Sequence, residues 1–217
     1  MTTRHTTKRW RRGSVLGAAA GVLAVGMVVT AIVGLTLPHT RQTGGPPTLD
    51  LAGHPVQVDG PAPAPSASAT PSGVGRFAAP SVGLDVPLGA LSVVDDVVEP
   101  PGFTSAYWVR NLGVAPADAA HGTVFVAMHS LRGGGVGPGN ALIDVAAGRP
   151  RIATGAAITV DDVRYRVTRT ETVGKGDIHA DAEVWANTPG RLVVITCLQR
   201  ADGERSVSNV VVEAMRA

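Results

Sequence analysis

Cysteine is almost absent from this chain, whose 217 residues include only Cys197. A lone cysteine cannot form an intramolecular disulfide, which excludes a small disulfide-stapled scaffold. It also cannot supply the several thiolates that a multi-cysteine metal cluster needs. The length leaves room for one ordinary domain with appendages, and not for several domains.

An excess of positive charge is absent from most of the chain, although the formal net charge is +2. Five of the 19 basic residues lie in the first twelve positions, and residues 13–37 carry no charge of either sign. From residue 38 onward, the remaining 14 basic residues face all 17 acidic ones, so this part is slightly acidic. It therefore offers no basic surface of the kind that binds nucleic acid.

The uncharged stretch predicts a membrane anchor over residues 15–37. As a helix, these 23 residues would span about 34 Å, enough for a hydrocarbon core of about 30 Å. The basic cluster precedes the stretch, so the positive-inside rule places residues 1–14 in the cytoplasm and the rest of this single-pass protein outside. A cleavable signal peptide is the alternative, but its apolar core would be only about 7–15 residues long.

A linker is expected over residues 38–75, which hold eight of the 16 prolines and six of the 27 glycines. A segment rich in Pro, Gly, Ala and Ser cannot bury enough apolar surface to offset the entropy of ordering it. We therefore expect a disordered spacer, which either acts as a passive tether or carries the following domain away from the membrane.

Residues 76–217 are expected to form one mainly β domain, because short apolar stretches alternate with Gly and Pro turns. Residues 164–171 alternate as a half-exposed strand does, whereas the apolar run at 191–197 predicts a strand buried on both faces. Further strands are predicted at 79–88, 122–129, 156–160 and 209–213, and short helices at 104–111, 141–147 and 181–186. The pattern favours a small barrel or sandwich.

Cys197 and His129 both stand where a predicted strand ends. Taken singly, a buried structural cysteine and a solvated histidine are the simpler interpretations. Together with Arg200 and Arg205, however, they supply a nucleophile, an acid/base and a group that stabilises an oxyanion. A lone thiol outside a membrane is also an oxidation liability unless it is buried or used.

Several segments together resemble the sortase cysteine transpeptidases. Residues 80–87 (PSVGLDVP) resemble their opening strand, His129 lies where they carry a histidine, and residues 193–197 (VVITC) resemble their Thr-Leu-x-Thr-Cys strand. Arg205 lies where their arginine precedes the last strand. The resemblance covers essentially all of residues 76–217, and an N-terminal anchor followed by a linker is the usual sortase layout. The small size and the expected lack of a C-terminal anchor are most similar to the class E/F actinobacterial type.

Two positions depart from the family pattern. Val193-Val194 replaces its Thr-Leu, and Met128 stands where a glycine commonly precedes the histidine. The choice of arginine is also open: Arg205 is favoured because it lies nearer the last strand, and Arg200 is the alternative.

The resemblance implies a closed sortase-type β-barrel with transpeptidase or hydrolase activity and no need for a metal or organic cofactor. Cys197 would cleave an LPXTG-like sorting signal of a secreted protein through a thioester, with His129 as acid/base and Arg205 at the oxyanion. An amine of a cell-wall precursor or a pilin would resolve the thioester. Thr196 is expected to contact substrate, and Trp185 either contacts substrate or packs against the domain.

Two alternatives stay open. A barrel that has lost catalysis would be an anchored binding module. The His121-Gly-Thr segment resembles a histidine motif of the L,D-transpeptidases, which cross-link cell walls, but their Ser-His/Arg-Gly-Cys signature is missing around Cys197. A metal site is not expected, because His179 and Asp181 lack further ligands at metal spacing.

Overall fold

A computed structural model describes residues 48–56 and 64–217 of this chain. The predicted cytoplasmic tail (1–14) and membrane anchor (15–37) lie outside the described residues. The described residues belong to one compact unit, 44–217. Within them, no helix is both long and apolar enough to cross a membrane.

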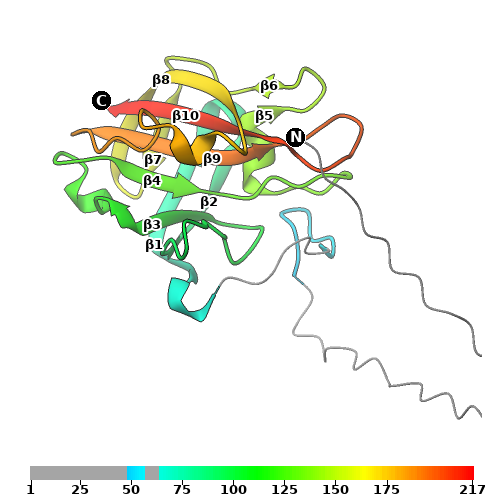
Figure 1. Cartoon of the computed structure of the whole chain (residues 1–217), viewed down its shortest axis with the longest axis horizontal. Helices are drawn as coiled ribbons and strands as arrows, with labels where there is room; N and C mark the ends of the chain where they lie inside the picture. The colour runs from blue at the N-terminus through cyan, green and yellow to red at the C-terminus, as the bar shows by residue number, and fades with distance from the viewer. Residues whose placement is uncertain (1–47, 57–63) are drawn as a thin grey trace, which may run out of the picture. The chain divides into compact units, whose positions relative to one another are not determined.

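Eight strands of this unit close into a barrel in the order β1-β2-β3-β4-β9-β10-β8-β7 (Figure 1). Neighbouring strands are antiparallel, except that β2 pairs with β3 and β4 with β9 in parallel. The elements are η1 (Pro65–Ala67), β1 (Thr70–Ala79), η2 (Pro80–Val82), β2 (Leu84–Leu91), β3 (Ala106–Gly113), η3 (Pro116–Asp118), β4 (Val124–Ala127), η4 (Pro138–Leu142), β5 (Ile143–Asp144), β6 (Arg149–Pro150), β7 (Ala157–Val160), β8 (Val163–Gly174), η5 (Ile178–Ala180), β9 (Arg191–Leu198) and β10 (Ser208–Arg216), each η being a short 3-10 helix. The prediction of a small, closed, mainly β barrel with a few short helices is confirmed.

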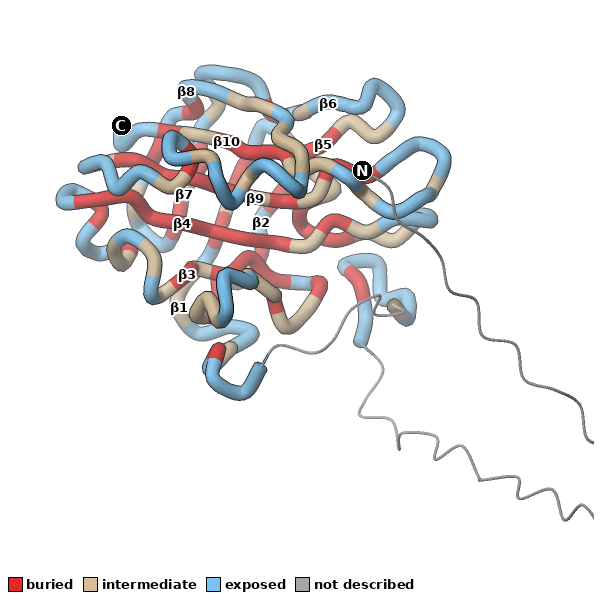
Figure 2. Tube along the Cα trace, in the orientation of Figure 1, coloured by how far each residue is buried: buried red, intermediate tan, exposed pale blue. Residues whose placement is uncertain are grey.

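Buried side chains form two clusters, one on each face of the barrel wall. Successive residues of β9 alternate between them: Leu192 and Val194 belong to the first cluster, and Val193 to the second. The second cluster also includes Tyr107 and Phe125. Figure 2 shows β4 and much of β9 as buried. The prediction that the run at 191–197 is a strand buried on both faces is therefore confirmed.

The helices predicted at 104–111, 141–147 and 181–186 were wrong. Residues 104–111 lie mostly in β3, residues 141–147 contain the end of η4 and the strand β5, and residues 181–186 make a single turn. The Asp181 carboxylate closes that turn by accepting the backbone N–H groups of Glu183 and Val184. A short apolar run is compatible with either a helix or a strand. Residues 106–113 form a strand because their backbone pairs with β2 and β4.

The barrel begins before the predicted domain boundary at Arg76. β1 starts at Thr70, which pairs with Ala90, and its register shifts before Gly75. Gly73 and Gly75 have φ angles of 101° and 133°, which other residues rarely adopt, so these glycines allow the strand to bend. The composition of this strand resembles that of a linker, although the strand is part of the barrel.

Candidate active site

The parallel pair β4–β9 brings two strand ends to the same edge of the barrel. Ala127 pairs with Ile195, and the backbone N–H of Met128 donates to the Ile195 carbonyl at 3.1 Å. His129 and Cys197 each follow two residues after that pair. The pairing therefore brings His129 and Cys197 to neighbouring strand ends, where both line one cavity.

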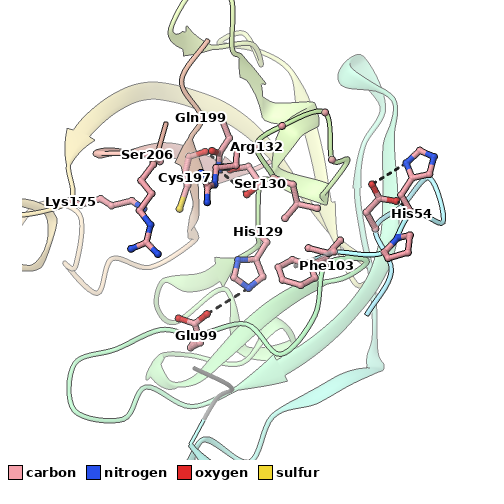
Figure 3. A pocket seen from close by; sticks show the side chains of 18 residues that line it. His54, Glu99, Phe103, His129, Ser130, Arg132, Lys175, Cys197, Gln199 and Ser206 are labelled. Atoms are coloured by element: carbon pink, nitrogen blue, oxygen red, sulfur yellow. Dashed lines mark hydrogen bonds and ion pairs between the residues drawn. The ribbon is translucent and has the colours of Figure 1, made fainter. Parts of the chain in front are cut away.

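His129 and Cys197 line an open cavity of about 760 Å³, into which both side chains point in Figure 3. Cys197 forms no disulfide and is half-buried, so a substrate can reach its thiol. Glu99, Lys175 and Arg205 also line this cavity and bring charges of both signs to it.

Three groups hold the imidazole of His129. Its Nε2 lies 2.9 Å from the carbonyl oxygen of Pro100 and 3.9 Å from a carboxylate oxygen of Glu99. The ring of Phe103 packs against it with 4.7 Å between the ring centroids. The segment before β3 supplies all three groups, and Figure 3 shows Glu99 below the ring of His129 and Phe103 to its right.

The surroundings of His129 favour its neutral form. Burial lowers the pKa of His129, and the positive charge of Lys175 lowers it further, while the hydrogen bond with Pro100 acts in the opposite direction. At the ordinary pKa of about 6.5, roughly a quarter of histidine side chains are protonated at pH 7, so the neutral imidazole predominates here. Burial raises the pKa of Glu99, which the charge of Lys175 partly offsets.

Replacing Lys175 with glutamine is expected to raise the pKa of His129, because the change removes a positive charge that disfavours the imidazolium. NMR titration of the ring resonances, assigned with a His129→Gln variant, measures this shift. Arg110→Gln is the control, since it removes a positive charge from a residue that does not line this cavity. A downward shift in Lys175→Gln would contradict the assigned influence of its charge.

The two candidate arginines lie in different places. Arg205 lines the cavity that contains Cys197 and His129. Arg200 lines a separate hollow beside the turn at 145–148, and its guanidinium forms an ion pair with Asp202. Of the two, Arg205 is the one that lines this cavity, and its catalytic role stays a prediction.

The two residues expected to contact substrate lie elsewhere. Thr196 faces away from the Cys197 side of β9, and a Cβ atom on Gly139 would lie only 1.9 Å from the Thr196 hydroxyl oxygen. The Thr196 side chain therefore packs within the wall, not against the cavity. Trp185 donates its indole N–H to the carbonyl of Ile178 at 2.5 Å and packs on the ring of Phe125, which favours the packing alternative.

Residues 48–56, from the predicted linker, also border the cavity. The buried carboxylate of Asp50 accepts backbone N–H groups of Ala52, His54 and Val136, and these hydrogen bonds lower its pKa. The Leu51 N–H donates to the Val136 carbonyl at 2.9 Å. This turn is thus tied to the loop that follows His129.

Sequence reasoning missed several cavity residues, including Glu99, Phe103, Ser130, Lys175 and Gln199. None of them stands next to Cys197 in sequence or in a motif of regular spacing. Only Ser130, which directly follows His129, had a local signal that could have suggested it. Across residues 48–56 and 64–217, no group of three or more His, Cys, Asp and Glu side chains could hold a metal ion.

No protein-family model and no curated protein matches this sequence. Solved structures of sortases do match it. Sortase A of Listeria monocytogenes is 22% identical, with a TM-score of 0.44, over 66% of this chain and 86% of that chain. A lid mutant of sortase A from Corynebacterium diphtheriae is 15% identical, with a TM-score of 0.45, over 65% and 68% of the two chains. The pilus-related sortase C of Group B Streptococcus is 14% identical, with a TM-score of 0.47, over 66% of each chain.

Proposed function

We propose that this protein is a membrane-anchored cysteine transpeptidase of the sortase type, with its barrel on the outer side of the membrane. The observation that carries the proposal is the parallel register of β4 and β9, which sets His129 beside Cys197 in one open cavity. Arg205 lines the same cavity. The uncharged residues 15–37, preceded by a basic tail, support the anchor and its orientation.

In the first half-reaction, neutral His129 accepts the proton of the Cys197 thiol, and the thiolate attacks the Thr carbonyl of an LPXTG-like sorting signal. The carbonyl oxygen becomes an oxyanion, which the guanidinium of Arg205 stabilises. When the bond between Thr and the following Gly breaks, protonated His129 gives its proton to the leaving amine. A thioester between Cys197 and the substrate remains.

In the second half-reaction, an amine attacks the thioester carbonyl and His129 accepts the proton that this amine loses. The carbon–sulfur bond then breaks, and the proton passes from His129 to the sulfur of Cys197. A cell-wall precursor or a pilin would supply the amine and receive the secreted protein. Water in place of the amine would give hydrolysis.

The test incubates the full-length protein, in detergent, with a small library of sorting-signal peptides and with hydroxylamine as a model amine. We expect mass spectrometry to detect a peptide thioester on Cys197 and a peptide hydroxamate cut after Thr. Peptides with the same residues in scrambled order are the control and should give neither product.

The inactive binding module makes a different prediction in the same experiment. A sorting peptide would protect Cys197 from alkylation, because it occupies the cavity, but neither thioester nor hydroxamate would form. That result would overturn the proposed transpeptidase activity and would support a protein that only binds sorting signals.

A further inference from the structure

We infer that Ser130 and Gln199 are positioning residues that hold the end of β4 against the end of β9, and so set the distance between His129 and Cys197. The inference rests on the proposed function of these two catalytic groups. Ser130 directly follows the histidine, and Gln199 follows the cysteine by two residues. We call this pair of side chains the Ser130–Gln199 clamp.

The two strand ends need such a clamp because their backbones separate at this point. The last backbone hydrogen bond between them joins Met128 to Ile195. Beyond it, the carbonyl of His129 accepts a hydrogen bond from the backbone N–H of Gly139 in η4, at 2.8 Å. No backbone–backbone hydrogen bond links His129 or Ser130 to β9, so both residues lie past the end of the β4–β9 ladder.

Side chains replace the missing ladder bonds. The Ser130 hydroxyl donates to the carbonyl of Cys197 at 2.6 Å. The carboxamide of Gln199 donates to the Ser130 carbonyl at 2.8 Å and to the Ser130 hydroxyl oxygen at 2.9 Å. Three hydrogen bonds thus join the two strand ends, and two of them end on backbone carbonyls, those of Ser130 and Cys197.

Burial makes these hydrogen bonds effective. Ser130 and Gln199 are 6% and 7% exposed, so water competes poorly for their polar groups. Side chains held by packing and buried hydrogen bonds keep a catalytic pair close to its productive geometry. A displacement of about 1 Å costs roughly 10²-fold in rate, which sets the expected size of the effect.

The variants Ser130→Ala and Gln199→Met each break two of the three hydrogen bonds of the clamp, and Gln199→Met also preserves side-chain volume. For hydroxylaminolysis of a sorting peptide, we expect kcat to fall about 10²-fold in each, with KM changing less than about twofold. The double variant should be little worse than either single one, because the two side chains act as a unit.

Thr123→Ala is the matched control. The Thr123 hydroxyl is also buried and also joins two segments, since it donates to the Ala186 carbonyl at 2.9 Å and accepts the Thr188 N–H at 2.7 Å. It precedes β4, however, and so lies at the opposite end of this strand from His129. We expect Thr123→Ala to lower the melting temperature while leaving kcat within about twofold of wild type.

A second measurement separates failure of the clamp from failure of the proposed function. The rate of Cys197 alkylation by iodoacetamide at pH 7 needs no peptide, and we expect both clamp variants to slow it as His129→Ala does. Unchanged kcat and alkylation in both folded variants would overturn the positioning role. A rise in KM with unchanged kcat would also overturn it, because the residues would then be contacting substrate.

Discussion

Replacing Cys197 with alanine is expected to lower the rate of peptide cleavage by about 10⁴-fold or more, and His129→Ala by a similar factor. Without the sulfur no thioester can form, and without the imidazole the leaving amine is not protonated. The loss should appear in kcat for hydroxamate formation, measured by mass spectrometry or chromatography of the cleaved peptide. Because both residues are only partly buried at the cavity, we expect both variants to remain folded.

His121→Ala is the control for the histidine variant. His121 is exposed and lies before β4, at the end remote from His129. Its replacement should leave cleavage at the wild-type rate, with an unchanged circular dichroism spectrum. Retained cleavage in Cys197→Ala or His129→Ala would instead remove that residue from the mechanism.

Replacing Arg191 with methionine is expected to lower the free energy of unfolding by about 3–5 kcal/mol. The buried Arg191 guanidinium makes two hydrogen bonds with Glu213, at 2.7 and 3.0 Å, and donates to the carbonyls of Glu183 and Ala186. Methionine leaves Glu213 and two carbonyls without this donor, which costs far more than an exposed ion pair does. Urea denaturation followed by circular dichroism measures the loss.

Arg169→Met provides the comparison on the same surface. Arg169 forms ion pairs with Glu171, Glu183 and Glu213, but its side chain is 44% exposed. Solvent screens such pairs, so we expect a much smaller loss of stability than for Arg191. Equal losses in the free energy of unfolding in the two variants would show that burial does not determine how much Arg191 contributes to stability.

Several strands were predicted correctly from the local sequence pattern, because the order of apolar and polar residues along each strand matches which side chains are buried and which are exposed. The continuous apolar run of β9 is buried on both faces, and the alternation in β8 places Tyr165 and Val167 in the core between exposed residues. These signals come from residues two or fewer positions apart. They identify a strand without identifying its neighbours in the sheet.

The candidate site depends on which strands are neighbours in the sheet, and local pattern does not contain that information. Periodicity does not say that β4 pairs with β9, or that they run in parallel, so it could not place His129 beside Cys197. The family resemblance suggested that these two residues act together, and the parallel register gives the physical reason. Glu99 and Lys175 reach the cavity from loops whose paths are set by packing across the whole barrel.

The errors have the same origin. At β3, the run that includes Tyr107 and Val109 satisfied a helical pattern, but hydrogen bonds with β2 and β4 hold it as a strand. At Thr70–Gly75, glycine and proline suggested a linker, yet pairing with β2 orders this bent part of β1. In both segments long-range pairing outweighs local preference.

The parallel pairing of β4 with β9 also governs when activity can arise during folding. The two strand ends join residues 68 positions apart, so their contact requires closure of a long loop, which is slow compared with forming local turns. Until the barrel closes, the thiol is exposed and has no base beside it. For a domain that folds outside the membrane, as we propose, Cys197 therefore becomes an activated nucleophile only once the barrel has closed.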